Sequence, residues 1–221
     1  MSLMKEEHQN FENLIIRIQM KEKELAQKII SHIEEISGGL YTLNQSNVKR
    51  VDFIKYIFDL ECYIGCKINP ILVEVWNRFN GCSFNNDIGI KPDDRVPTLG
   101  DGELIELTRF FSIESTGDNV LEMLRSNADI FGKEYIPFAE AIEGDFFVLS
   151  SRGNGIYYVL HDFNEDEKCF HKVADTISDF FMAVQLMVAT EKIDNEKMRI
   201  VSSSLSSPLL SKLKKFKENN K

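Results

Sequence analysis

The residues best suited to chemistry are two histidines and an aspartate in the second half of the chain. His161 is followed directly by Asp162, and His171 lies on the next predicted strand. An imidazole beside a carboxylate is typical of acid–base and metal sites. No third ligand stands at a diagnostic spacing, and a hydrogen-bonded structural histidine is the commoner use of such a position. We therefore predict no catalytic residue, no metal ligand and no cofactor.

The four cysteines also lack a recognisable site pattern. Cys62 and Cys66 are one helical turn apart, but Cys82 and Cys169 supply no paired spacing for zinc. Buried, reduced thiols are the better interpretation, as expected in a cytoplasmic protein. The one Gly-x-Gly, at residues 153–155, lies between two predicted strands rather than between a strand and a helix, so it is not a dinucleotide-binding loop.

Composition and charge restrict the class of protein. The 221 residues are 43% hydrophobic and 28% charged, with a net charge of −9 and a pI near 5.1. Five Lys and one Glu in residues 208–221 leave −13 on the preceding 207 residues. This balance argues against nucleic-acid binding and permits a basic partner. Neither a signal peptide nor an apolar run of 18 residues is found, so we expect a soluble, cytoplasmic protein.

A predicted β-hairpin would position these residues. Residues 145–151 and 156–163 are rich in aromatic and branched side chains, and residues 152–155 supply a turn that tolerates positive φ. Neither strand has a purely polar face. The hairpin is therefore predicted to lie in the interior of a sheet that is covered on both sides.

A long helix is predicted over residues 4–36, followed by Gly38 and Gly39 as a C-terminal cap. It either folds back along the domain or projects as a coiled-coil or partner-binding arm. We favour the first interpretation, because two or three heptads are weak evidence for a coiled coil.

Further helices are predicted between this helix and the hairpin. The first covers residues 47–63, with Ile54, Ile57 and Phe58 on its inward face, and the second begins at Asn69-Pro70 and carries Trp76 into the core. Residues 82–102 are predicted to be irregular, with one short hairpin at residues 85–87. A strand at residues 103–113 and a helix at residues 119–131 complete this part.

After the hairpin we predict a strand at residues 168–173 and a helix at residues 177–190. Thr176 and Asp179 form the capping-box pattern that would begin this helix. Residues 202–207 contain five Ser and are predicted to be a linker. Residues 208–221 can form a short basic helix or a tail.

Six short segments, in this order and spacing, resemble the signature of the SUKH superfamily. They are NPILVEVWNRFNG at 69–81, TRFFSI at 108–113, IPFA at 136–139, GDFFVL at 144–149, IYYVLHD at 156–162 and KVADTISDFF at 172–181. The resemblance covers residues 48–186. Leu160 stands where the family pattern usually has Trp.

The resemblance implies an α+β fold, with a mainly antiparallel central sheet flanked by helices. To this the chain adds a long N-terminal helix and a C-terminal tail. The predicted divisions are a helical extension at 1–45, the SUKH-like domain at 46–190, and a polar linker with a basic helix or tail at 191–221.

The resemblance also implies a function in protein binding, without shared catalytic residues. Bacterial members bind and neutralise a cognate polymorphic toxin, often a nuclease or a deaminase, and an immunity protein is therefore our first expectation. The alternative is an intracellular regulatory scaffold related to cell-wall synthesis regulators. We expect a protein partner, namely a basic toxin domain, and neither nucleic acid nor a membrane span.

The residues expected to contact this partner lie in loops beside the central hairpin, because loops carry recognition more often than cores do. They are Arg152, Asn154, Asp162, Asn164, Glu165 and Asp166.

Overall fold

The computed structural model describes residues 2–42, 50–113, 119–153, 155–161 and 169–187. The chain divides into two compact units, Met1–Met187 and Val188–Lys221, and every described residue belongs to the first. The predicted Ser-rich linker and basic tail lie outside the described residues. The division of the chain at residues 45 and 190 remains a prediction.

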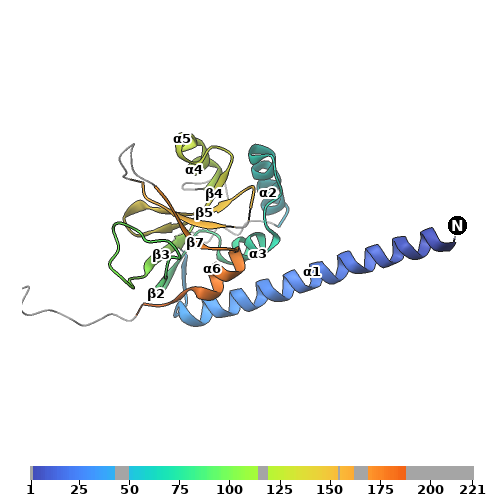
Figure 1. Ribbon diagram of the computed structural model, residues 1–221, viewed down its shortest axis with the longest axis horizontal. Coiled ribbons are helices and arrows are strands. Elements are labelled where there is room, and N and C mark those ends of the chain that lie inside the picture. The colour runs from blue at the N-terminus through green and yellow to red at the C-terminus, as the bar shows by residue number, and fades with distance from the viewer. Residues whose placement is uncertain (1, 43–49, 114–118, 154, 162–168, 188–221) are drawn as a thin grey trace, which may run out of the picture. The chain divides into compact units, whose positions relative to one another are not determined.

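A single antiparallel sheet forms the body of the first unit (Figure 1). Strands β1 to β7 lie side by side in the order in which they occur in the chain, and β8 pairs with β2 outside this order. With helices packed on this sheet, the predicted α+β class is confirmed. The strands are β1 Leu40–Thr42, β2 Cys82–Ile90, β3 Ile105–Phe110, β4 Tyr135–Ala141, β5 Phe146–Ser150, β6 Ile156–Val159, β7 Phe170–Ala174 and β8 Gln185–Leu186.

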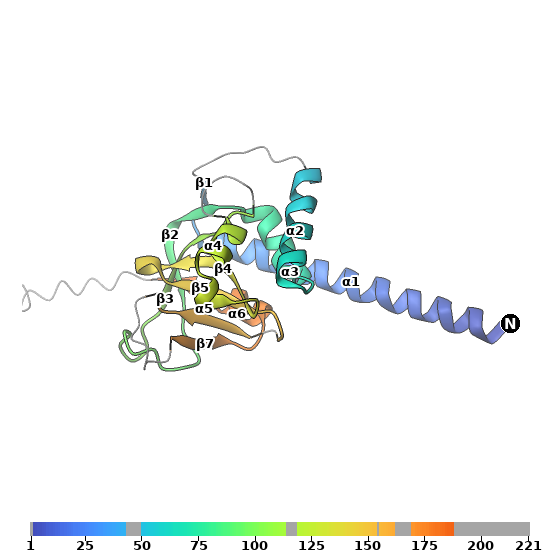
Figure 2. The ribbon, with the colours of Figure 1, turned by 90° about the horizontal axis from the view of Figure 1, so that it is seen from above.

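Helices cover both faces of the sheet. Helices α3 and α6 and the end of α1 pack on one face, while α4 and α5 lie over the other (Figures 1 and 2). Helix α2 lies beside α3 in both views. The helices are α1 Ser2–Ile36, α2 Arg50–Ile64, α3 Pro70–Phe79, α4 Val120–Ser126, α5 Ala128–Phe131 and α6 Ile177–Ala183, with a short 3-10 helix at Ile142–Gly144.

The predicted central hairpin is confirmed as β5 and β6, which lie between β4 and β7. Adjacent phenylalanines of β5 contact opposite layers of helix. Phe147 meets Phe180 of α6 at 5.1 Å between ring centroids, and Phe146 meets Phe131 of α5 at 5.3 Å. Both faces of the hairpin are therefore buried, as the absence of a polar face predicted.

Helix α1 is confirmed over its predicted length, and Gly38 follows it with φ of 64°. Among residues 16–36, whose side chains the structure describes, the last part is buried: Ala26, Ile29, Ile30 and Ile33 belong to the core. The side chains of residues 16–21 are all exposed. Figure 1 shows the N-terminal part of α1 continuing away from the sheet. The favoured interpretation, a helix folded back along the domain, therefore holds only for residues 26–36.

The prediction of an irregular segment at residues 82–90 is wrong, because these residues form the nine-residue strand β2. Asn is unfavourable in strands, which made the segment resemble a loop. In the structure the two asparagines bind the end of α1. Asn86 donates its backbone N–H to Ser37 O at 2.9 Å, and its side-chain amide reaches Ile36 O at 3.1 Å. The Asn85 amide reaches Gly38 O at 3.2 Å. The polar side chains thus supply donors for carbonyls that the end of a helix leaves unpaired.

Two predicted helices are shorter than expected. The one at residues 119–131 is divided at Asn127, whose side-chain amide donates to Met123 O at 3.0 Å and so competes with the helical bonding pattern. The one at residues 177–190 ends at Ala183. Val184 is extended and buried, and residues 185–186 pair with β2 instead.

Two predicted helix starts are confirmed, at Asn69 and at Thr176. Asn69 Oδ1 accepts from Ile71 N–H at 2.9 Å, with Pro70 as the first helical residue. Thr176 Oγ1 accepts from Asp179 N–H at 3.1 Å. Trp76 is fully buried, as predicted. These assignments succeeded because a cap depends only on neighbouring residues.

Candidate protein-binding surface

The outer face of α2 exposes two large apolar side chains. Ile54 and Phe58 are one helical turn apart and are 59% and 58% exposed. Cys62, one turn further, is also exposed. Phe58 is the one exposed aromatic among the large apolar side chains of the described residues. Exposed apolar residues grouped on one helix face are typical of protein interaction sites.

The inward face of α2 differs from the predicted one. Leu60 and Ile64 are buried, and Phe53, Tyr56 and Ile57 are partly buried against the core. The prediction correctly placed Ile57 inward but wrongly placed Ile54 and Phe58 there. The helix carries apolar side chains on two faces, and periodicity alone cannot say which of two apolar faces meets the core.

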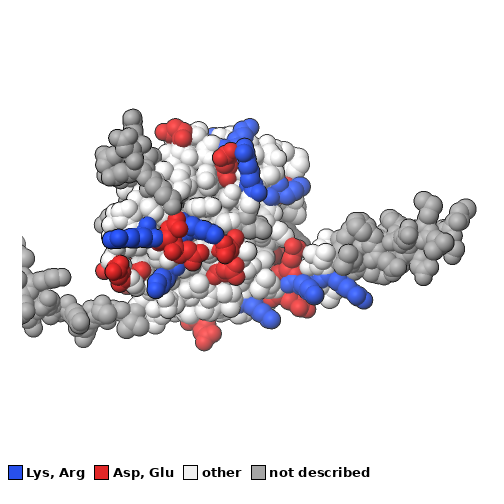
Figure 3. All heavy atoms as spheres, in the orientation of Figure 1, with Lys and Arg blue, Asp and Glu red and all other residues white. Residues whose placement is uncertain are grey.

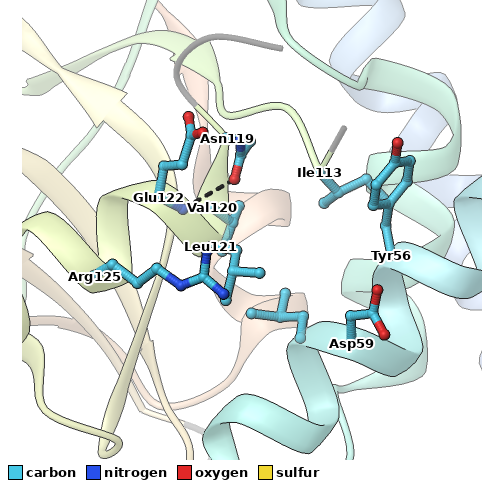
Figure 4. Close-up of a pocket in the computed structure, with 9 residues that line it drawn as sticks. Tyr56, Asp59, Ile113, Asn119, Val120, Leu121, Glu122 and Arg125 are labelled. Carbon is cyan, nitrogen blue, oxygen red and sulfur yellow. Dashed lines mark hydrogen bonds between the residues drawn. The ribbon is translucent and has the colours of Figure 1, made fainter. Parts of the chain in front are cut away.

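A recess of about 160 Å³ lies on the other side of α2, between this helix and α4 (Figure 4). Tyr56 and Asp59 of α2 face Leu121 and Arg125 of α4 across it, with Ile113 beside them. Its mixed lining of apolar and charged groups suits a short peptide segment better than a large cofactor, because ligand pockets usually enclose 300 Å³ or more.

Helix α4 is held in place at its first turn. Asn119 Oδ1 accepts from Glu122 N–H at 2.9 Å, and Val120 N–H donates to Ser112 O at 2.9 Å. At the other end of α4, the Arg125 guanidinium lies 5.9 Å from the Tyr63 ring centroid of α2. This cation–π contact joins the two helices that form the recess.

An acidic surface lies near the loop between β2 and β3. Asp93, Asp94, Asp101 and Glu103 line a recess of about 360 Å³ together with Lys91 and Arg95. Figure 3 shows acidic and basic side chains gathered on the face drawn there. The loop also protects the edge of the sheet: Asp94 N–H donates to Lys172 O at 2.9 Å, and Asp94 Oδ2 accepts from Lys172 N–H at 3.0 Å.

Glu106 of β3 is destabilising at neutral pH. Desolvation, and secondly the nearby Asp87, raise the pKa of its carboxyl above the ordinary value of 4.5. The protonated carboxyl therefore stabilises the folded state relative to the ionised one. This stabilisation is fully present below about pH 4.5 and is lost as pH rises through the raised pKa. We expect Glu106→Gln to raise the midpoint of thermal unfolding at pH 7 and to leave it nearly unchanged at pH 4. The exposed Glu24→Gln serves as a control. A variant that stabilises equally at both pH values would contradict this assignment.

Asp145 connects the two strands of the central hairpin at one end. It is buried and accepts three hydrogen bonds: from the Tyr158 hydroxyl, from His161 N–H at 2.8 Å and from His161 Nδ1 at 2.8 Å. The third contact requires a proton on Nδ1, which leaves Nε2 of the ring for other contacts. His161 is 48% exposed. This carboxylate–imidazole pair is the most enzyme-like group in the described structure.

The other predicted partners of His161 are placed differently. Asp162 lies outside the described residues. His171 is buried in β7, opposite Tyr158 in the strand register. Within the described ranges, no three or more His, Cys, Asp or Glu side chains are arranged to hold a metal ion.

Three of the four cysteines, Cys66, Cys82 and Cys169, do not have the properties of nucleophiles. Burial raises the pKa of the Cys82 thiol, and nearby Arg78 only partly offsets this effect. The pKa values of Cys66 and Cys169 are also raised, chiefly by desolvation. A raised pKa keeps a thiol protonated and unreactive at neutral pH. The predicted burial holds for Cys82, whereas Cys62 is exposed.

Of the six predicted contact residues, only Arg152 is described. It is 80% exposed and forms an ion pair with Glu134, with 2.6 Å between Nη2 and Oε1. Asn154, Asp162, Asn164, Glu165 and Asp166 lie outside the described residues. Their role in binding remains a prediction.

Comparison with known proteins gives one family match. The model of the SMI1 / KNR4 family (SUKH-1) matches residues 55–183, which include α2 from residue 55 onward, all strands from β2 to β7, and α6. A search among curated proteins gave no match. Among the described helices, none is long and apolar enough to cross a membrane.

Proposed function

The chain belongs to the SMI1 / KNR4 family (SUKH-1), and from this premise we propose that it is a cytoplasmic immunity protein that binds and thereby neutralises a cognate toxin. Proteins of this family are in general non-catalytic immunity proteins or regulators. The partner would be a basic toxin domain of the nuclease or deaminase type. No cofactor enters the proposed function, because inhibition requires only a stable complex.

The exposed outer face of α2 is the observation that carries this proposal. Leaving Ile54 and Phe58 in water forgoes the free energy of burial, about 1.5–3 kcal/mol for each fully buried side chain. A partner that covers them recovers this free energy on binding. Aromatic side chains surrounded by other contacts are typical of the few residues that dominate the affinity of an interface.

Charge supports a basic partner. Residues 1–207 carry a formal charge of −13, whereas the last 14 residues, 208–221, carry +4. Acidic groups such as Asp59 and Glu122 border the α2–α4 recess on the other side of this helix. Opposite net charges accelerate encounter, so association should be faster at low salt. A toxin that acts on nucleic acid needs a positive surface, and an acidic inhibitor is suited to cover it.

An intracellular regulatory scaffold is the second candidate, because the N-terminal part of α1 is exposed. The two functions differ in what a truncation does. Deleting residues 1–20 removes exposed helix but leaves the buried Ala26, Ile29 and Ile33 in place. Toxin binding should survive this deletion, whereas a scaffold that recruits partners through α1 should lose them.

The test begins with the full chain as bait, used to recover bound proteins from its native host. We expect Phe58→Asp to weaken the complex with the recovered toxin by about 30-fold or more, as for a contact worth at least 2 kcal/mol. Binding is measured by titration calorimetry. Met182→Asp is the matched control, because Met182 is an exposed apolar side chain on α6.

Three results would contradict the proposal or relocate the surface. If no toxin-like protein is recovered, or if the chain binds one without protecting cells from it, the immunity function is wrong. If Phe58→Asp binds normally, the outer face of α2 is not the interface. Arg152→Glu then tests the predicted hairpin turn, and Leu121→Asp tests the α2–α4 recess.

A further inference from the structure

The recess between α2 and α4 has a floor of apolar side chains. Leu60 of α2, Val120 of α4 and Ile113, which precedes α4, all line it and are all buried. Its volume of about 160 Å³ is close to that of an apolar cavity that holds one benzene molecule, about 150 Å³. The recess can therefore take one small molecule whose body is apolar.

Two exposed charges of opposite sign face each other above this floor. Asp59 lies on α2, and Arg125 lies across from it on α4 (Figure 4). No ion pair among the described residues includes either side chain, so the two charges stand apart and do not neutralise each other. The remaining charged residue of the lining is Glu122, and Figure 4 shows its carboxylate directed away from both.

The α4 side of the recess is suited to an anion. The Arg125 guanidinium lies 5.9 Å from the ring centroid of Tyr63, and Lys133 Nζ lies at the same distance from that centroid. Positive charge thus collects around Tyr63. Because a guanidinium carries several N–H donors, its contact with the ring leaves donors for a carboxylate, which Arg binds in a bidentate manner.

We propose that the α2–α4 recess binds a small apolar α-amino acid, of the size of valine or leucine, as its zwitterion. Arg125 binds the α-carboxylate, and Asp59 binds the α-ammonium group. The apolar side chain of the ligand covers Leu60 and Val120. Both charged residues line a recess no larger than one small molecule, so a single ligand can reach both. This site does not depend on the proposed toxin binding.

The pair of charges separates this ligand from other small molecules. An apolar carboxylic acid would bind Arg125 but would bring its negative charge near Asp59. An apolar amine, or the side chain of a lysine from a partner, would bind Asp59 but would approach the like charge of Arg125. A neutral apolar molecule would cover the floor and compensate neither charge. A zwitterion compensates both, and few polar groups around an apolar body are typical of ligand sites.

The first experiment titrates the full chain with L-leucine by calorimetry and by NMR of the backbone amides. We expect saturable binding with a Kd of about 1 mM or tighter, with shifts at the amides of Asp59 and Leu121. At about ten times this Kd, L-leucine should raise the midpoint of thermal unfolding by about 3–6 °C. L-Serine is the matched ligand control: it is also a zwitterion but lacks the apolar side chain, so it should bind about tenfold more weakly or worse.

The second experiment assigns each charge by pairing a variant with a ligand that lacks the corresponding group. Asp59→Asn should weaken L-leucine binding about tenfold but leave the binding of 4-methylpentanoate, which has no ammonium group, unchanged. Arg125→Gln should weaken L-leucine binding to a similar extent but leave the binding of L-leucinamide, which has no carboxylate, unchanged. Both replaced side chains are exposed, so both variants should fold normally.

Asp129→Asn is the matched control variant, because Asp129 is an exposed carboxylate of α5 that does not line the recess. It should bind L-leucine as the unaltered chain does. The proposal would be overturned if L-leucine shows no saturable binding at about 10 mM, or if both Asp59→Asn and Arg125→Gln bind it normally. Equal affinity for L-leucine and for either singly charged analogue would also overturn it. Loss of the toxin complex would leave this result untouched, because no toxin takes part in either titration.

Discussion

Replacing Phe180 by alanine is expected to lower the free energy of unfolding by about 3–5 kcal/mol. The ring is fully buried at the centre of the aromatic cluster between α6 and the sheet. It contacts Phe138 of β4 at 5.3 Å, Phe147 of β5 at 5.1 Å and its neighbour Phe181 at 5.2 Å between ring centroids. Alanine would leave a cavity that rings held by three different elements cannot close.

Urea unfolding of Phe180→Ala measures this loss, with Met182→Ala as the matched control. Met182 lies on the same helix but is exposed, so its truncation should change stability by about 0.5 kcal/mol or less. For a domain of this size the larger loss corresponds to a fall of about 6–20 °C in the midpoint of thermal unfolding. Equal effects of the two variants would show that α6 does not pack on the sheet through Phe180.

Replacing Asp145 by alanine is expected to cost about 3 kcal/mol, a large effect for a polar side chain. The carboxylate is buried and satisfies the Tyr158 hydroxyl together with His161 N–H and Nδ1. Removing it deletes the carboxylate to which the buried Tyr158 hydroxyl donates, and the loss of a buried hydrogen-bond partner costs about 1–3 kcal/mol. The lost charge-assisted hydrogen bonds add to this cost.

Denaturant unfolding of Asp145→Ala is compared with Tyr158→Phe and His161→Ala. Each of these removes a donor but leaves the acceptor, so each should cost less than the loss of Asp145. The three variants should retain toxin binding when folded, because the group joins β5 to β6 and lies outside the proposed interface. Loss of an enzymatic activity in His161→Ala, with stability unchanged, would instead assign this pair to catalysis.

The central part of the fold was predictable because the signals are local. Residues 152–155 specify a turn, the flanking strands have two apolar faces, and Asn69 and Thr176 cap helices through bonds to residues two or three positions away. The strand at residues 82–90 was missed for the opposite reason. Asn85 and Asn86 find their partners about 50 residues away, at the end of α1, and no local pattern reveals such a pairing.

The candidate surface was only partly predictable. Both apolar faces of α2 are visible in the sequence, but only the packing of Leu60 and Ile64 in the core shows that Ile54 and Phe58 face outward. His161 and Asp145 are 16 residues apart, so their pairing depends on the strand register and not on a sequence motif. In the sequence the carboxylate next to His161 is that of Asp162.

The order of the strands has a consequence for how the chain folds. From β2 to β7 each strand pairs with the one that follows it, so these pairings can form in sequence as the chain is synthesised. The attachment of α1 is the exception. His32 Nε2 lies 2.9 Å from Val184 O, and β8 returns to pair with β2. Asn85 and Asn86 of β2 can bind the end of α1 early in this order, whereas its contact with Val184 forms only after the pairings from β2 to β7 are possible. The core face of α1 at Ala26, Ile29 and Ile33 is therefore not fully covered until residue 184 has emerged, and until then it is available to chaperones and to neighbouring chains.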